Sequence, residues 1–297
     1  MTASALRLLR VPLTIVAIWW ALSAAIPAAM DQYAPYLVRA GIRCIHDPLV
    51  LSGQFIPRNT CLGLADLYHR TFSDLFIESM FRSLALLVGA AVLALTVGTL
   101  LGVAAAMLRR RAFASGGILA GTTLLTAVPA FFVAYFLQIV VIIVGATPEG
   151  GKLLPVFGFG YDSHLVLPLL SISLPAIAYT AQLTATRMID VLNADFITVA
   201  TAKGLRPSWI LAVHVLPHVR PVLLEGLGSG LRVSVASLPI IEYLFNWRGI
   251  GQLALEAVGV HDAPGFIFSA LVLAALFTTL SALADLSRPR ALYQAAA

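Results

Sequence analysis

Arg187–Pro221, RMIDVLNADFITVATAKGLRPSWILAVHVLPHVRP, is the longest polar interruption in the second half of the chain, and hydrophobic stretches flank it on both sides. Asn193 or Asp195 is expected to cap a first helix, because a side-chain oxygen there accepts bonds from first-turn amides. Gly204 can adopt the left-handed conformation that ends a helix, and Pro207 suits the first turn of a second one. The stretch therefore predicts a knob of two short helices that fits a groove on another protein.

Each short helix is predicted to have an apolar side. In the first helix, Phe196, Val199 and Ala200 share a face at helical spacing, and Lys203 suits the negative end of the helix dipole. The second helix is expected to carry its apolar side on three residues at similar spacing: Trp209, Val213 and Leu216. Two prolines are expected to end it and to start the next hydrophobic stretch: Pro217 and Pro221.

The composition indicates a membrane protein. Hydrophobic residues make up 60% of the 297 residues and charged residues 11%, whereas a soluble domain carries about 25% charged residues. The net charge is +5, but the basic residues cluster between hydrophobic stretches, as membrane topology requires. The positions of the basic residues therefore argue for lipid as a partner and against nucleic acid.

Six hydrophobic stretches predict an all-α protein with six transmembrane helices. The first helix occupies 1–29, although its apolar run could also belong to a signal peptide. An extracytoplasmic segment, 30–77, separates it from a five-helix core, 78–290, and a tail, 291–297, follows. The knob is the loop 187–220 of that core. The five core spans are expected at about 81–107, 116–144 (kinked at Pro129), 164–184, 221–241 and 265–286, with a short helix near Gln252–Val258.

The distribution of Lys and Arg predicts which side each loop faces. With both termini on one side, that side holds 11 of the 19 basic residues, including the dense turn Arg109–Arg111, and the other side holds 7. Because short cytoplasmic loops are rich in Lys and Arg, the termini and the knob are predicted to be cytoplasmic.

No catalytic or metal-binding set is apparent in the sequence. The chain has no G-x-x-x-x-G-K-[ST] phosphate loop and no G-x-S-x-G elbow. His214 and His218 are spaced i, i+4, but Pro217 interrupts them and no glutamate follows His214, so a metal site is not expected. Five acidic residues are interpreted as solvated charges of outer loops or as contacts to a docking protein, and not as a catalytic carboxylate pair: Glu149, Asp162, Glu242, Glu256 and Asp262.

Arg232 lies about midway along a predicted span, where a charge is retained only beside a cavity or a partner. Glu225, seven residues earlier, shares its helix face. Both residues are candidates for lining a translocation path or contacting a partner subunit. Small residues in the spans, Gly98-x-x-x-Gly102 and Gly226-x-Gly228-x-Gly230, are expected to permit close helix packing.

Cys44 and Cys61 are the only cysteines, and both fall in the segment predicted to be extracytoplasmic. That compartment permits disulfides, and closing a loop of about this length contributes roughly 3 kcal/mol in the chain-entropy model. A disulfide between them is predicted, with two unpaired thiols as the alternative.

The knob sequence resembles the cytoplasmic coupling loop of ABC importer permeases, most closely those of the oligopeptide, dipeptide and nickel uptake group. The resemblance covers roughly residues 80–290 and includes five further segments: Ala127–Phe131, Leu167–Pro168, Leu216–Pro217, Glu242–Gly251 and His261–Pro264. The chain departs from the family pattern at Arg232, Pro239 and Arg248, which leaves the substrate open.

This resemblance implies a permease subunit of the bacterial inner membrane, without enzymatic activity or a cofactor of its own. ATP and Mg²⁺ would bind two separate ATPase subunits, and a second homologous permease and an extracytoplasmic substrate-binding protein would complete the importer. Peptides or a nickel chelate would pass by alternating access. The residues implied to contact an ATPase subunit are Asp195, Phe196, Val199, Ala200, Thr201, Ala202, Lys203, Gly204 and Leu205.

A transporter driven by an ion gradient is the alternative interpretation. Such a protein needs intramembrane acidic residues for coupling, and Glu225 is the only plausible one. Copurification of the chain with ATPase subunits would separate the two possibilities.

Overall fold

A computed structural model describes residues 72–145, 154–260 and 262–287, together with residue 17 and the short stretches 44–45, 49–51, 54–56 and 60–61. The predicted first span, apart from Ala17, and the predicted tail lie outside the described residues. The regular secondary structure of the described residues is helical except for two short pairs of strands.

The strands belong to the segment predicted to be extracytoplasmic. β1 (Cys44–Ile45) pairs with β4 (Thr60–Cys61), and β2 (Leu49–Leu51) pairs with β3 (Gln54–Ile56), both antiparallel. The register of the first pair places Cys44 opposite Cys61. Opposed residues of antiparallel strands have Cα atoms about 4.5–5.5 Å apart, which is within the range that a disulfide spans. The disulfide itself stays a prediction.

Helices cover all five predicted core spans. α3 (Phe72–Leu93), the π-helical turn η1 (Ala94–Gly98) and α4 (Thr99–Met107) form one continuous run, followed by α5 (Ala112–Ala127) and α6 (Ala130–Gly145). After the 3₁₀ turn η2 (Ser163–Leu165) come α7 (Val166–Leu192), α8 (Asp195–Ala202), α9 (Pro207–Trp209), the π-helical η3 (Ile210–Val215) and α10 (Leu216–Phe245). The expected short helix is α11 (Ile250–Gly259), and α12 (Ala263–Ser287) is the last.

Four of these helical runs in the described part are long and apolar enough to cross a membrane: Leu75–Met107, Ser163–Leu192, Pro207–Phe245 and Gly265–Ala282. The α5–α6 pair makes a fifth if it counts as one broken span.

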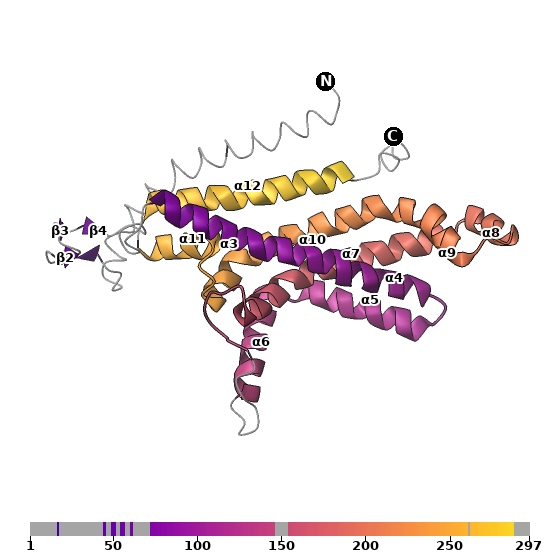
Figure 1. Cartoon of the computed structure of the whole chain (residues 1–297), viewed down its shortest axis with the longest axis horizontal. Helices are drawn as coiled ribbons and strands as arrows, with labels where there is room; N and C mark the ends of the chain where they lie inside the picture. Colours follow the sequence, from indigo (N-terminus) through magenta and orange to yellow (C-terminus); the bar gives the residue numbers. More distant parts are fainter. Residues whose placement is uncertain are drawn as a thin grey trace. The chain divides into compact units, whose positions relative to one another are not determined.

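The break between α5 and α6 is sharper than the predicted kink, because the two helices meet at an angle of 100° (Figure 1). Pro129 lacks a backbone N–H and disfavours a helical conformation in the residue before it. Val128 accordingly has φ −91° and ψ 126°, which is extended backbone. One proline therefore ends one helix and starts another.

Pro217 and Pro221 act differently, and the expectation that they end a helix is wrong. The helical run continues from Pro207 to Phe245 through both prolines. The π-helical turn η3 lies directly before Pro217. Its wider turn accommodates a proline ring and a missing donor that would break an α-helix.

Contacts between residues divide the chain into two units. Unit 1 comprises residues 1–85, 157–161 and 238–278, and unit 2 comprises residues 86–156, 162–237 and 279–297. α3, α10 and α12 each have residues in both units.

In unit 2, α7 is the central helix, and glycines let its neighbours approach. A Cβ at Gly98 would lie 2.8 Å from the carbonyl oxygen of Ile177, and one at Gly102 would lie 2.7 Å from that of Ala181. Gly226 on α10 meets the α7 backbone at Thr180 in the same way. The packing role predicted for these glycines is confirmed.

In unit 1, the start of α3 packs against α11. Leu75 and Phe76 form a core with Ile250, Leu253 and Ala257. The Phe76 ring also meets that of Phe268 on α12 edge to face, with 4.8 Å between centroids. This cluster buries the apolar side of α11, which explains why a short, half-apolar helix forms between two long spans.

Candidate functional site: the coupling knob

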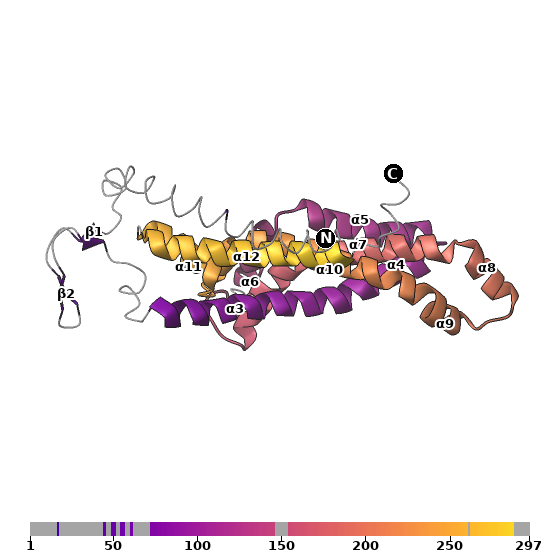
Figure 2. The same cartoon turned by 90° about the horizontal axis from the view of Figure 1, so that it is seen from above.

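The predicted knob lies in unit 2, beyond the ends of α7 and α10 in both views (Figures 1 and 2). We define the knob as α8, the turn 203–206, α9 and η3. It has its own buried core, so its shape is fixed by packing. The core contains Ile197, Ala200, Ile210 and Val215 from the knob and Ala106, Met188, Val191 and Val219 from the helices beneath it.

The predicted cap of α8 is wrong. The residue that precedes the helix is Ala194, whose side chain makes no capping bond, and Asn193 instead ends α7. Asp195 is the first residue of α8, where its negative charge still favours the positive end of the helix dipole. The buried contacts of Ile197 and Ala200 stabilise the helix start in place of a side-chain cap.

The predicted end of α8 at Gly204 is confirmed. Gly204 has φ +74°, and its N–H donates to the carbonyl of Thr201 while Leu205 N–H donates to that of Ala200. These two bonds form the Schellman motif, in which a left-handed residue closes a helix. Lys203 is the C-cap residue, at the negative end of the dipole.

The apolar face predicted for α8 is divided between the core and the surface. Ala200 is buried, whereas the side chains of Phe196 and Val199 are 43% and 53% exposed. Ile197, which was not among the residues predicted for this face, supplies the buried contact instead. The predicted helical spacing was correct, but it could not show which part of the stripe faces inward.

The exposed apolar residues continue across the turn into α9. Every residue from Thr201 to Trp209 is exposed, and the Trp209 side chain is 58% exposed. Four residues form what we call the apolar tip: Phe196, Val199, Leu205 and Trp209. A surface of this kind at the end of a rigid knob is suited to a groove on another protein.

His214 and His218, which are spaced i, i+4, contribute to the packing of the knob. The His218 ring stacks on Phe196, with 5.6 Å between centroids, and its Nδ1 is 2.9 Å from the carbonyl oxygen of His214. These contacts fasten one edge of the apolar tip to the start of α10.

Arg232 and Glu225 lie on α10, and the structure gives Arg232 a neutral neighbour. Its Nη2 donates to Ser229 Oγ at 2.9 Å, and the side chain is half-buried. The i, i+7 spacing keeps both candidate residues on one side of α10, as predicted.

The interpretation of Glu242 as a solvated loop charge or a contact to a docking protein is wrong. Its side chain is 0% exposed, on the last turns of α10. The carboxyl group accepts bonds from Ser83 Oγ at 2.5 Å and from the amides of Gly251 and Gln252 at 2.8 and 3.1 Å. It therefore joins α10, α3 and the start of α11 within unit 1.

Glycines near the start of α11 are the sequence signal for this buried carboxyl group. A Cβ at Gly249 would collide with the Glu242 carboxyl group, and one at Gly251 would lie within 3.0 Å of it. Glu242 alone gives no such signal, but an acid followed seven and nine residues later by glycines could have indicated that its carboxyl group packs against the start of α11.

Trp247 is the second buried anchor of unit 1. It is fully buried between two residues with left-handed backbones, Asn246 at φ 54° and Arg248 at φ 57°. Its Nε1 donates to the Arg82 carbonyl at 3.1 Å, and its ring meets that of Phe159 at 4.9 Å. The strained turn is thus stabilised by burial of the indole.

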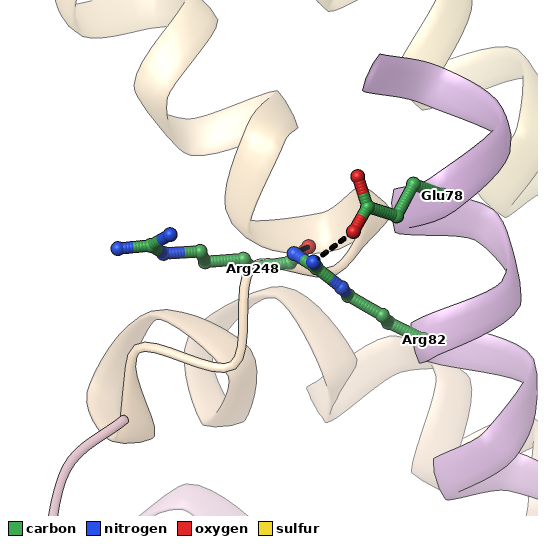
Figure 3. Close-up of polar contacts among 3 residues, drawn as sticks. All are labelled: Glu78, Arg82 and Arg248. Carbon is green, nitrogen blue, oxygen red and sulfur yellow. Dashed lines mark hydrogen bonds and ion pairs between the residues drawn. The ribbon is translucent and has the colours of Figure 1, made fainter. Parts of the chain in front are cut away.

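Arg82 completes this arrangement. Its guanidinium pairs with Glu78 and lies 4.0 Å above the Phe159 ring. Figure 3 shows the pair, with the Arg248 side chain extending away from it. The arrangement joins α3 to the 157–161 loop and the end of α10 within unit 1, which indicates a structural role.

The segment before α7 has a titratable pair in unit 2. Asp162 accepts bonds from the His164 ring and backbone amide, at 2.7 and 3.1 Å, and these bonds hold the pKa of Asp162 below its usual value. Asp162 thereby caps η2, and its side chain stays exposed, so this acid is a solvated charge that also acts as a cap.

Comparison with known proteins gives one consistent picture. The family model described as "Binding-protein-dependent transport system inner membrane component" matches residues 98–293. A protein of Brucella ovis described as a peptide permease is 29% identical over 224 residues, covering 74% of this chain and 70% of the relative. The permease protein of the metal-staphylopine import system of Staphylococcus aureus is 28% identical over 208 residues, covering 70% and 64%. A peptide ABC transporter permease protein of Sinorhizobium fredii is 28% identical, covering 72% and 69%.

Proposed function

Because the chain belongs to the family of binding-protein-dependent transport system inner membrane components, we propose that it forms half of the translocation path of an ATP-driven importer. It is a multi-pass permease subunit of the plasma membrane. A second homologous permease would supply the other half of the path, and a substrate-binding protein would deliver the solute from outside. Both termini and the knob would then be cytoplasmic, as the charge distribution predicts.

The knob is the observation that supports coupling to separate ATPase subunits. It is an exposed tip mounted on a packed core, at the ends of α7 and α10. A tip held in this way transmits displacement to the helices beneath it, because packed cores move as bodies and do not deform continuously. ATP and Mg²⁺ would be bound by the partner subunits that grip the tip.

The solute is proposed to be a peptide or a metal chelate. Two relatives are named for peptide transport and one for import of metal–staphylopine. In each case the binding protein would select the solute first, and the path would have to differ in its contacts between the outward-open and inward-open states.

The coupling proposal is tested by placing a charge on the apolar tip. We expect Val199→Glu, at a position 53% exposed, to leave the knob folded and to abolish its docking, because a carboxylate would be buried against an apolar groove. Binding of the ATPase subunits to the purified permease pair, and solute-stimulated ATP hydrolysis, should both fall at least about tenfold.

Ala112→Glu is the matched control. Ala112 is exposed at the start of α5, after the arginine-rich turn, so the same charge is added on the same predicted side without touching the knob. Normal coupling in Val199→Glu would refute the role of the tip. Ala200→Glu is a poor test, because Ala200 is buried in the knob core and the variant would unfold the knob.

A further inference from the structure

We propose that Arg232 binds the carboxylate of the solute as it passes, which makes the path selective for carboxylate-bearing solutes. This inference rests on the proposed import function and adds a substrate class to it. Four features of unit 2 support it: the depth of Arg232 on α10, the face on which it lies, its one hydrogen bond to a described residue, and the chemistry of its guanidinium.

Arg232 lies at the centre of its helix. It is the seventeenth of the 30 residues of α10, so it is within about 2 Å of the helix midpoint at 1.5 Å per residue. The predicted span 221–241 is centred one residue away, so in a bilayer core about 30 Å thick Arg232 would lie roughly 15 Å from either surface. The side chain is therefore too deep to reach an interface, and a charge there requires water or an anion.

The face that carries Arg232 points away from α7. Gly230 packs so closely on Ala176 of α7 that no side chain would fit, and Ser234 donates to the Ile172 carbonyl of α7 at 2.7 Å. Arg232 is two residues from each of them, which is about 200° around an α-helix. Its neighbours Val233 and Ala236 are exposed, whereas Gly228, one turn earlier on the same side, packs on Ala284 of α12. This side of α10 is therefore covered at Gly228 and exposed at Val233 and Ala236, where a path or a partner can lie.

The guanidinium is held but not neutralised by the described residues. Its hydrogen bond goes to the neutral Ser229 hydroxyl, at 2.9 Å. That bond uses one of five N–H donors and orients the group along the helix. Four donors on a permanent positive charge are thus left for another group, in a position where an uncompensated charge is expensive.

A carboxylate, like a phosphate, matches the geometry of these donors. The planar fork of a guanidinium makes two parallel hydrogen bonds to a carboxylate, and such charged bonds are the strong ones. Peptides end in a carboxylate, so the donors match the proposed solutes. A half-buried guanidinium held by one neutral contact suits a solute that binds and then leaves. A permanent buried ion pair would instead need most of the guanidinium donors to be satisfied.

The test uses the complete importer in proteoliposomes with two probes. One is a dipeptide with a free C-terminal carboxylate and the other is the same dipeptide as its C-terminal amide, in a sequence that the isolated binding protein binds equally in both forms. For each probe the initial uptake rate of Arg232→Gln is divided by that of the wild type, so that delivery by the binding protein cancels.

We expect the ratio to fall about tenfold to a hundredfold for the acid, since bonds to charged groups contribute about 1.5–3 kcal/mol. The ratio should stay within about twofold of one for the amide, and Arg232→Lys should lie between the wild type and Arg232→Gln for the acid. Arg110→Gln, which removes an exposed arginine from the α4–α5 turn, should change neither probe.

Three outcomes would count against the inference in different ways. An equal loss for both probes would refute carboxylate recognition while leaving import intact. Loss of the second permease from the purified Arg232→Gln and Arg232→Lys complexes would show that Arg232 holds the partner subunit instead. Uptake of neither probe by the wild type would refute the proposed solute class itself.

Discussion

At the scale of single residues, backbone conformation and side-chain packing make separable demands, and two glycines of unit 2 show the difference. Gly204 has φ +74°, whereas Gly117 lies inside α5. A Cβ at either position would meet nothing within 4 Å. A substitution by alanine therefore tests the backbone alone at each site.

We expect Gly204→Ala to destabilise the knob by about 1–2 kcal/mol, the penalty for an L-residue in the left-handed region. Gly117→Ala should be neutral or stabilising by about 0.5–1 kcal/mol, since glycine is unfavourable inside a helix. Proteolysis of the turn 203–206 and thermal unfolding of the purified protein measure the two effects. Equal stability of the two variants would contradict the need for a left-handed residue.

At the scale of elements, α11 depends on a carboxyl group from another helix. Three donors converge on Glu242, which is fully buried: Ser83 Oγ and the amides of Gly251 and Gln252. These two amides are among the first-turn groups that a helix leaves unsatisfied at its N-terminus. The element is thus formed by its own sequence but held in place by α10.

We expect Glu242→Ala to destabilise the protein, because each buried donor left without an acceptor costs on the order of 1–3 kcal/mol. Amide hydrogen exchange should rise across Ile250–Gly259 and less across α7. Glu242→Gln keeps one acceptor oxygen and should give a smaller rise. Unchanged exchange in α11 of the alanine variant would show that Glu242 does not anchor it.

At the scale of the whole molecule, the α5–α6 break determines how many times the chain crosses the membrane. The two helices meet at an angle of 100°, and only together are they long and apolar enough to cross a membrane. They form either a broken span or a loop that returns to the side from which it entered. The charge distribution predicts a broken span, with Lys152 and the arginine turn on opposite faces.

Reporter fusions distinguish these two arrangements. We expect a fusion after Glu149 to report the extracytoplasmic side and a fusion after Arg110 to report the cytoplasm, because short loops dense in arginine stay inside. Fusions at Gly53 and Ala297 should likewise fall on opposite sides. A cytoplasmic signal at Glu149 would show that α5 and α6 form a re-entrant loop and would reduce the predicted count of six spans.

The sequence by itself determined the features that depend on local chemistry. The helical class follows from composition, and the end of α8 follows from Gly204, whose left-handed conformation is a property of one residue. The close packing at Gly98, Gly102 and Gly226 follows from the absence of a side chain. The segments that carry the family resemblance could likewise be recognised from their residues and their order along the chain.

Only the tertiary structure decided the features that depend on what lies opposite. Spacing placed Phe196, Val199 and Ala200 on one stripe, but the core beneath the knob took in Ala200 and Ile197 and left the other two exposed. Glu242 looked like a loop charge until Ser83, from a helix 159 residues away in sequence, was beside it. Burial and hydrogen-bond satisfaction are sums over neighbours distant in the chain, and periodicity along a single segment carries no information about them.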